Sequence, residues 1–280
     1  THHPSSAASD VYKRQEAGEH FTPRDIIKLM VNLIFIPVKD QIKNTTYLVY
    51  DCACGSGGML TEAENFLLEL ATGMGKKVVI HLFGQEVNPE TYAICQADML
   101  IKVKETDNIK YASTLASDGF PDFTFDFMLA NPPYGKSWKV DQDKILVGRK
   151  KEVKDNRFLV KHQGEELQLI PRSSDGQLLF LVNKLSKMKD STKLGSRIAI
   201  VHNGSALFTG DAGSGESNIR RWIIENDWLE CIVGLPLNMF YNTGIATYIW
   251  IISNKKSVER RGKVQLIDGR EWYGCLLYTS

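Results

Sequence analysis

The chain has 280 residues, of which 43% are hydrophobic and 24% are charged. These values are typical of a globular domain and argue against general disorder. The formal net charge of +1 provides no overall attraction to nucleic acid, so any contact with phosphates requires a local basic segment or a partner.

Both ends of the chain read as foreign sequence. Residues 10–15, Asp-Val-Tyr-Lys-Arg-Gln, can be encoded by a short DNA segment whose reverse complement, shifted by one base, encodes Cys-Leu-Leu-Tyr-Thr-Ser. That hexapeptide stands at 275–280, so the two ends resemble one transposon-type sequencing adapter read in both directions. We expect residues 1–15 and 275–280 to be adapter-derived and residues 16–274 to be a native fragment.

The first native element is predicted to be an amphipathic helix. Thr22 is the expected N-cap and Pro23 the first helical residue. Apolar residues spaced three and four apart follow, which is the periodicity of a helix with one buried face: Ile26, Ile27, Met30, Val31 and Ile34.

Strand and helix patterns alternate along the rest of the chain. We expect strands at 47–51, 78–84, 125–130, 197–202, 229–233 and 246–252. Helical patterns fall between them, at 59–71, 89–104, 177–188 and 219–226. This alternation predicts an α/β fold with a mostly parallel, twisted sheet and helices on both faces.

A glycine-rich loop follows the first predicted strand and precedes a helix. It runs from Asp51 through Gly55, Ser56 and Gly57 to Gly58. Glycines at such a junction let a ligand approach backbone amides, although similar turns also bind dinucleotides or close a tight bend. The loop lacks the Gly-Lys-Ser/Thr ending of a phosphate-binding loop, and an acid before the glycines would repel a pyrophosphate. S-adenosylmethionine, with an ammonium, a sulfonium and a ribose, fits better.

An acid and two cysteines accompany this loop. Glu86 ends the second strand, where a carboxylate can accept hydrogen bonds from ribose hydroxyls, or it is an exposed loop acid. Cys52 and Cys54 have no matching second pair, so we expect packing residues and no metal site. The five cysteines, an odd number, favour a reducing compartment. No apolar run approaches the roughly 20 residues that span a bilayer, so we expect a cytoplasmic protein without a membrane partner.

The tetrapeptide Asn131-Pro132-Pro133-Tyr134 follows a hydrophobic strand, at the edge where open α/β sheets hold reacting groups. A rigid turn would explain the prolines, but not the flanking Asn131 and Tyr134. The Asn131 side-chain oxygen and the Pro132 carbonyl can accept hydrogen bonds from an amino group and free its delocalised lone pair for methylation. Tyr134 offers a face for stacking a base flipped out of a duplex.

These motifs resemble the modification subunit of type I restriction-modification systems, within the amino-group DNA adenine methyltransferases. The resemblance covers about residues 18–252, with its pieces in order at 21–23, 51–58, 86, 131–134, 197–208 and 238–247. It implies a Rossmann-like methyltransferase fold across 16–274. It also implies methyl transfer from S-adenosylmethionine to the exocyclic amino group of adenine in a specific DNA sequence. The implied partners in the bacterial cell are DNA, a specificity subunit, a second copy and a restriction subunit.

The resemblance also implies roles for individual residues. Asn131, Pro132, Pro133 and Tyr134 would be catalytic and hold the adenine, and Glu86 would bind the cofactor ribose. Phe240 would pack against the flipped base, or it is an ordinary core residue. Relatives usually have proline in place of Cys52, and the residue that meets the cofactor adenine, near 112–115, stays unassigned. Further residues would line the cofactor: Glu19, His20, Phe21, Thr22, Pro23, Arg24, Ser56, Gly57 and Gly58.

Several alternatives remain open. The chain could belong to an adenine methyltransferase fused to its own recognition domain, or to one that acts on RNA or on a protein glutamine. The segment at 21–23 favours DNA. A non-catalytic cofactor-binding module is a different class, and the presence of Asn131 and Tyr134 argues against it. The segment 136–161, in which positive residues outnumber acidic ones, either contacts DNA phosphates or is a solvated loop.

Overall fold

The computed structural model describes residues 22–149, 151–240 and 244–272. The expected adapter-derived ends, 1–15 and 275–280, lie outside the described residues, as do Glu19, His20 and Phe21. None of the described helices has the length and apolar character needed to cross a membrane.

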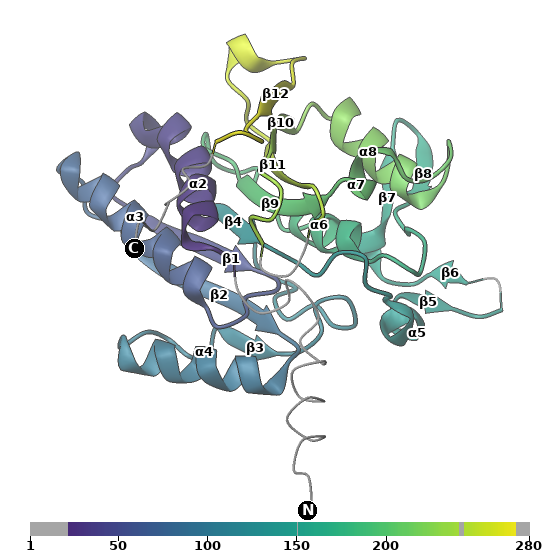
Figure 1. Ribbon diagram of the computed structural model, residues 1–280, viewed down its shortest axis with the longest axis horizontal. Coiled ribbons are helices and arrows are strands. Elements are labelled where there is room, and N and C mark those ends of the chain that lie inside the picture. The colour runs from purple at the N-terminus through teal and green to yellow at the C-terminus, as the bar shows by residue number, and fades with distance from the viewer. Residues whose placement is uncertain (1–21, 150, 241–243, 273–280) are drawn as a thin grey trace, which may run out of the picture.

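Eight strands form one central sheet (Figure 1): β1 (Thr46–Asp51), β2 (Val79–Glu86), β3 (Ile109–Tyr111), β4 (Phe127–Ala130), β9 (Arg197–Asn203), β10 (Leu229–Gly234), β11 (Thr247–Ser253) and β12 (Gln265–Asp268). Their order is β12-β10-β11-β9-β4-β1-β2-β3. Neighbours are parallel except at β11, which runs antiparallel to β9 and β10. The expected mostly parallel sheet is therefore confirmed.

Helices cover both faces of this sheet, as expected: α2 (Arg24–Phe35), α3 (Gly58–Gly73) and α4 (Pro89–Ile101) on one face, and α6 (Gln177–Leu185) and α8 (Gly215–Glu225) on the other. The side chains of β4 show why helices must cover both faces of the sheet. Phe127 and Leu129 pack with the first group of helices, whereas Met128 and Ala130 pack with the second. Alternate residues of a strand point to opposite faces, so a fully apolar strand requires cover on both.

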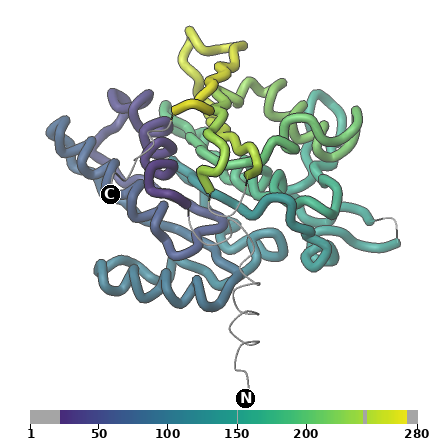
Figure 2. The backbone as a smooth tube through the Cα atoms, viewed as in Figure 1, coloured from purple at the N-terminus to yellow at the C-terminus, as the bar shows by residue number. Residues whose placement is uncertain are grey.

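The direction of the chain reverses beside β1. From β1 the chain proceeds outward to β2 and β3, and then returns to place β4 and β9 on the other side of β1. In open α/β sheets such a reversal leaves a crevice at the carboxyl ends of the strands, where ligands bind. Figure 2 shows the early part of the chain meeting the late part, since α2 packs against β9 and β11.

Some local expectations were wrong or incomplete. Helix α2 begins at Arg24 with Pro23 at the N-cap position, so Thr22 is not the cap. β3 and β12 were not predicted; both are short and largely exposed, so they carry little apolar pattern. Beyond the tetrapeptide, the helices α5 (Gln142–Ile145) and α7 (Ser205–Phe208) are also short. Two small hairpins lie outside the central sheet: β5 (Leu146–Val147) with β6 (Glu152–Val153), and β7 (Leu159–His162) with β8 (Glu165–Gln168).

Candidate active site

A pocket of about 380 Å³ opens at the carboxyl ends of the strands beside the reversal. Its wall is formed by residues that follow β1, end or follow β2, follow β3 and follow β4: Cys52, Ala53 and Gly55; Gln85, Glu86, Val87 and Asn88; Ala112, Ser113 and Thr114; and Asn131, Pro133 and Lys136. The sequence motifs on different strands are thus brought to one cavity, which is large enough for a small-molecule ligand.

Asp51 lies beneath the glycine loop and is not part of the described pocket wall. Its side chain is only 1% exposed, and its Oδ1 accepts a hydrogen bond from the Ala53 backbone N–H at 2.9 Å. Burial raises the pKa of Asp51 to about 6, while the nearby Lys184 ammonium acts in the opposite direction. Asp51 therefore shapes the loop from within, and its contact with a ligand stays a prediction.

The glycines of the loop serve different purposes. Gly55 is in the pocket wall and adopts a positive φ of 55°. Gly57 has φ 81°, and a Cβ there would lie 2.8 Å from the Cys95 Sγ and the Met99 Cε of α4. Gly57 is thus required for close packing of the loop on α4. Ser56 and Gly58, which were predicted to bind the cofactor, are not in the described wall.

Glu86 holds the loop and the start of α4 together. Its Oε2 accepts the Gly55 backbone N–H at 2.9 Å, and its Oε1 accepts the Asn88 backbone N–H at 2.7 Å. Asn88 in turn caps α4 through its Oδ1. Because each carboxylate oxygen can accept more than one hydrogen bond, Glu86 remains able to bind hydroxyl groups in the pocket. Glu86 ends β2 and lines the pocket, while its contact with a ribose stays a prediction.

The tetrapeptide leaves two buried polar atoms without a hydrogen-bond partner among the described residues: the Asn131 Oδ1 and the Tyr134 hydroxyl. The other end of the Asn131 amide is held, because its Nδ2 donates to the Thr22 Oγ1 at 3.2 Å. Burial raises the pKa of Tyr134, which keeps its hydroxyl neutral. A buried acceptor without a partner costs free energy unless a ligand satisfies it.

Burial and one further hydrogen bond fix the tetrapeptide and the glycine that follows it. Pro132 is buried, and the Gly135 backbone N–H donates to the Asp175 Oδ1 at 3.0 Å. Asp175 also accepts hydrogen bonds from Gln177 and Ser205 at its Oδ2. Asp175 was not predicted, because it lies in an irregular segment distant in sequence and belongs to no motif.

The remaining predicted residues differ in how near they lie to the pocket. Thr22 contacts Asn131, whereas Pro23 and Arg24 are not in the described pocket wall. Phe240 is 2% exposed and belongs to the core cluster against which Tyr134 packs. Its contact with a base stays a prediction.

Cys52 and Cys54 are buried in opposite core clusters, which agrees with packing roles. Burial raises the pKa of Cys52 to about 11, so its thiol is neutral. The residues after β3, left unassigned from sequence, include the wall residues Ala112, Ser113 and Thr114.

The model of the N-6 DNA methylase family matches residues 8–275 of the chain. The type I restriction enzyme MjaIX methylase subunit of Methanocaldococcus jannaschii is 28% identical over 262 residues, which cover 91% of this chain and 41% of that protein.

Solved structures with a similar fold include the methyltransferase subunit of a type I restriction-modification system from Streptococcus thermophilus. It has a TM-score of 0.72 and 26% identity, over 93% of this chain and 50% of that one. A structure assigned to the class I S-adenosylmethionine-dependent methyltransferases, from Listeria monocytogenes, has a TM-score of 0.65 over 92% of this chain and 68% of that one. Its 17% identity supports the fold alone. The chain spans half or less of the length of these two type I subunits. It belongs to the N-6 DNA methylase family.

Proposed function

We propose that this chain carries the methyl-transfer site of the modification subunit of a type I restriction-modification system. The reaction would transfer a methyl group from S-adenosylmethionine to the exocyclic amino group of adenine in DNA. The names of the related type I methylase subunits support this proposal. The observation that carries it is the Asn131 Oδ1, a buried acceptor beside the pocket without a hydrogen-bond partner in the described part of the chain.

The pocket fits a nucleoside cofactor without phosphates. Glu86 places an acidic acceptor in the wall, and an anionic phosphate there would be repelled. Glu86 would bind the ribose, and the backbone at Gly55 and at Ser113 and Thr114 would contact the rest of the nucleoside. When bound, S-adenosylmethionine supplies an electrophilic methyl group on a sulfonium.

The tetrapeptide would act on the target amine. The Asn131 Oδ1 and the Pro132 carbonyl would accept its two N–H hydrogen bonds, which favours a pyramidal nitrogen with an available lone pair. After transfer the nitrogen loses one proton to solvent. The acceptors need no reorganisation, because Thr22 holds the Asn131 amide and the prolines restrict the backbone. Tyr134 and Phe240 would pack against the flipped adenine.

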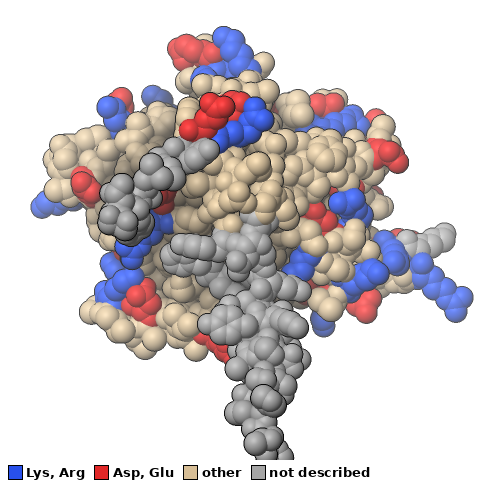
Figure 3. All heavy atoms as spheres, in the orientation of Figure 1, with Lys and Arg blue, Asp and Glu red and all other residues tan. Residues whose placement is uncertain are grey.

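Exposed cations near the β5–β6 hairpin form a candidate surface for DNA phosphates. Lys144, Arg149 and Lys151 are exposed there, and Figure 3 shows positive side chains gathered over this part of the molecule. We propose that they contact DNA, while sequence recognition comes from a specificity subunit. A second copy of the modification subunit and a restriction subunit would complete the assembly.

Methyl transfer can be tested directly. The purified chain, alone and with the specificity subunit of its own system, is incubated with methyl-labelled S-adenosylmethionine and DNA, RNA or a release-factor protein. We expect label in N6-methyladenine of DNA. Label in cytosine, RNA or protein glutamine instead would refute the proposal.

The DNA surface is tested by charge reversal. The double variant Lys144→Glu, Lys151→Glu should weaken DNA binding. The slope of log affinity against log salt concentration should become shallower by about two units, one for each lost phosphate contact. The exposed Lys28 on α2 provides the control, since Lys28→Glu should change neither quantity. An unchanged salt slope in the double variant would remove this surface from the DNA interface.

A further inference from the structure

Arg157 departs from the rest of the basic segment 136–161. It lies in a short turn between the two hairpins and is only 7% exposed, whereas Lys144, Arg149 and Lys151 face solvent. A buried guanidinium is costly unless its charge is balanced and its donors are used. Arg157 therefore cannot contact DNA phosphates, and its role must lie in what it touches inside the protein.

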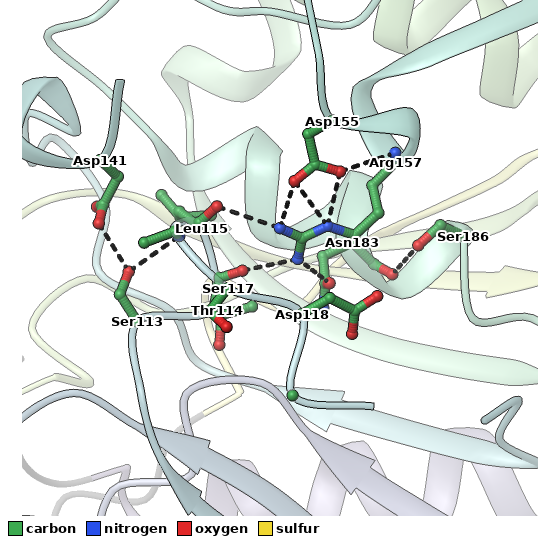
Figure 4. Close-up of polar contacts among 12 residues, drawn as sticks. Ser113, Thr114, Leu115, Ser117, Asp118, Asp141, Asp155, Arg157, Asn183 and Ser186 are labelled. Carbon is green, nitrogen blue, oxygen red and sulfur yellow. Dashed lines mark hydrogen bonds and ion pairs between the residues drawn. The ribbon is translucent and has the colours of Figure 1, made fainter. Parts of the chain in front are cut away.

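Every N–H donor of Arg157 has an acceptor (Figure 4). Asp155 balances the charge, accepting from Nε at 3.1 Å and from Nη2 at 2.7 Å. The Thr114 carbonyl accepts from Nη1 at 2.7 Å, and the Leu115 carbonyl accepts from Nη2 at 3.2 Å. The second Nη1 donor is used by the Asn183 Oδ1 at 2.8 Å. The planar, rigid arrangement of these five donors is specific to arginine.

The two carbonyls belong to the segment that follows β3 and forms one wall of the pocket. Pairing with β2 ends at Ala112, whose N–H donates to the Glu86 carbonyl, and the chain beyond it is irregular. The Thr114 hydroxyl donates to the Cys52 carbonyl, but the backbone carbonyls of Thr114 and Leu115 depend on Arg157. The basic segment contacts this wall a second time, because the Ser113 Oγ donates to the Asp141 Oδ1 at 2.9 Å. Two side chains of the same segment thus hold the wall from outside.

The same wall is also held from inside the sheet. Asn183 connects Arg157 to the Tyr50 hydroxyl, into which the Asn183 Nδ2 donates at 3.2 Å. The Tyr50 hydroxyl donates to the Gln85 Oε1 at 2.9 Å, and the Gln85 Nε2 donates to the Ser117 carbonyl at 3.1 Å. Arg157 therefore completes a continuous hydrogen-bond network that joins β1, β2, α6 and the segment after β3, and that is buried from Arg157 to Gln85.

We propose that Arg157 is a positioning residue for the cofactor pocket, which sets the backbone of Ser113 and Thr114 against the nucleoside part of the bound cofactor. This inference rests on the proposed function. It assigns the basic segment a second role, distinct from DNA contact: its exposed cations face solvent while its buried arginine holds the wall of the pocket. The loss of Arg157 should weaken cofactor binding and leave the chemistry of Asn131 intact.

The test measures binding of S-adenosylhomocysteine to the purified chain by calorimetry, together with KM for S-adenosylmethionine and kcat. Arg157→Met should raise the Kd and KM about tenfold or more, because two buried carbonyls lose a charged donor, with kcat changed less than about twofold. Arg157→Lys should restore little, since the three donors of an ammonium cannot replace the five that Arg157 uses in a fixed plane. Arg221→Met is the matched control: the Arg221 side chain on α8 is 37% exposed and paired with Glu165 and Glu225, and its loss should leave the Kd within about twofold.

The possible outcomes separate this inference from the proposed function. If the wild-type chain does not bind S-adenosylhomocysteine, the proposed function fails and the inference with it. If the wild type binds and folded Arg157→Met binds equally well, the inference alone is overturned. Should Arg157→Met fail to fold, Arg157→Lys decides, because it keeps a cation opposite Asp155 but cannot supply all five hydrogen-bond donors. We expect a Kd about tenfold higher for folded Arg157→Lys, and an unchanged Kd would overturn the inference.

Discussion

The glycine loop after β1 and the tetrapeptide after β4 lie side by side at the same edge of the sheet. Their polar side-chain atoms differ in whether they have hydrogen-bond partners within the protein. In the loop, Asp51 accepts the Ala53 N–H, and Glu86 at the end of β2 accepts the Gly55 N–H with one oxygen and the Asn88 N–H with the other. In the tetrapeptide, the Asn131 Oδ1 and the Tyr134 hydroxyl are buried without a partner among the described residues.

This difference indicates that the loop shapes the pocket, whereas the tetrapeptide acts on the substrate. The hydrogen bonds of the loop are internal, so its conformation is formed before any ligand arrives and its contribution is a preformed wall. The tetrapeptide carries unpaired acceptors in a fixed position, which is the arrangement expected of a group that acts on a substrate. Changes in the tetrapeptide should therefore affect rate, and changes in the loop should affect stability or cofactor affinity.

The largest effect is expected for Asn131→Ala. Loss of the acceptor should reduce methyl transfer by about 10²–10³-fold, as is typical when one preorganised hydrogen-bonding group is removed from a site. Single-turnover assays measure the rate and calorimetry the affinity for S-adenosylhomocysteine. Asn218→Ala, at an exposed hydrogen bond on α8, is a control with an unchanged rate. Loss of cofactor binding in Asn131→Ala would mean that Asn131 shapes the pocket as the loop does.

Gly57→Ala should have the next largest effect, on stability. The new Cβ would lie 2.8 Å from the Cys95 Sγ and the Met99 Cε at a positive φ, and the two penalties together should lower the free energy of unfolding by about 2–4 kcal/mol. Gly58→Ala is the matched control. Beyond its chain neighbours and its own helix backbone, no atom would lie within 4 Å of a Cβ at Gly58, and because Gly58 is the first residue of α3, alanine there should stabilise by less than about 0.5 kcal/mol. Equal urea midpoints for the two variants would refute the packing role of Gly57.

Asp51→Asn should change how stability depends on pH. Burial raises the pKa of Asp51 from 3.8 to about 6, with Lys184 opposing the shift and Glu86 adding to it. The folded state therefore holds this proton more tightly than the unfolded state, so ionisation lowers the free energy of unfolding as pH rises from about 4 to about 6, by up to about 3 kcal/mol.

The side-chain amide introduced by Asp51→Asn cannot ionise, so the free energy of unfolding of the variant does not fall with pH in this way. The difference in the free energy of unfolding, Asp51→Asn minus wild type, should rise between pH 4 and pH 7, as measured by urea titration at each pH. A difference independent of pH would show that Asp51 ionises freely and that the loop is less enclosed than its contacts indicate.

The smallest effect is expected for Glu86→Gln. One oxygen becomes an NH₂ group that cannot accept a backbone N–H, so the wall should loosen and cofactor affinity should fall about tenfold, with kcat at saturating cofactor little changed. Glu90→Gln, at an exposed position in the first turn of α4, should behave as wild type. A large fall in kcat instead would place Glu86 with the tetrapeptide as a group that acts on the reaction.

Much of the fold follows from periodicity. The helices α2, α3, α4 and α6 were expected close to their observed bounds because their apolar residues repeat with the period of a helix, and α8 was expected four residues late. The central strands were expected because they are short apolar runs, buried on both faces in β4. β3 and β12 were missed because short edge strands bury little. The predicted N-cap of α2 was wrong because the Thr22 hydroxyl accepts a hydrogen bond from the Asn131 side chain, which is 109 positions away in the sequence.

The sequence by itself determined the motifs of this protein and the order in which they occur, because the tetrapeptide, the glycine loop and Glu86 are recognisable from residue types and local pattern alone. Tertiary structure decided which polar atoms are left without a partner and which are not. Whether Asn131 keeps a free acceptor, whether Asp51 is enclosed, and whether Arg157 faces solvent or the pocket wall depend on burial and on neighbours distant in sequence. Burial and pairing are properties of the packed chain, so no local pattern reports them.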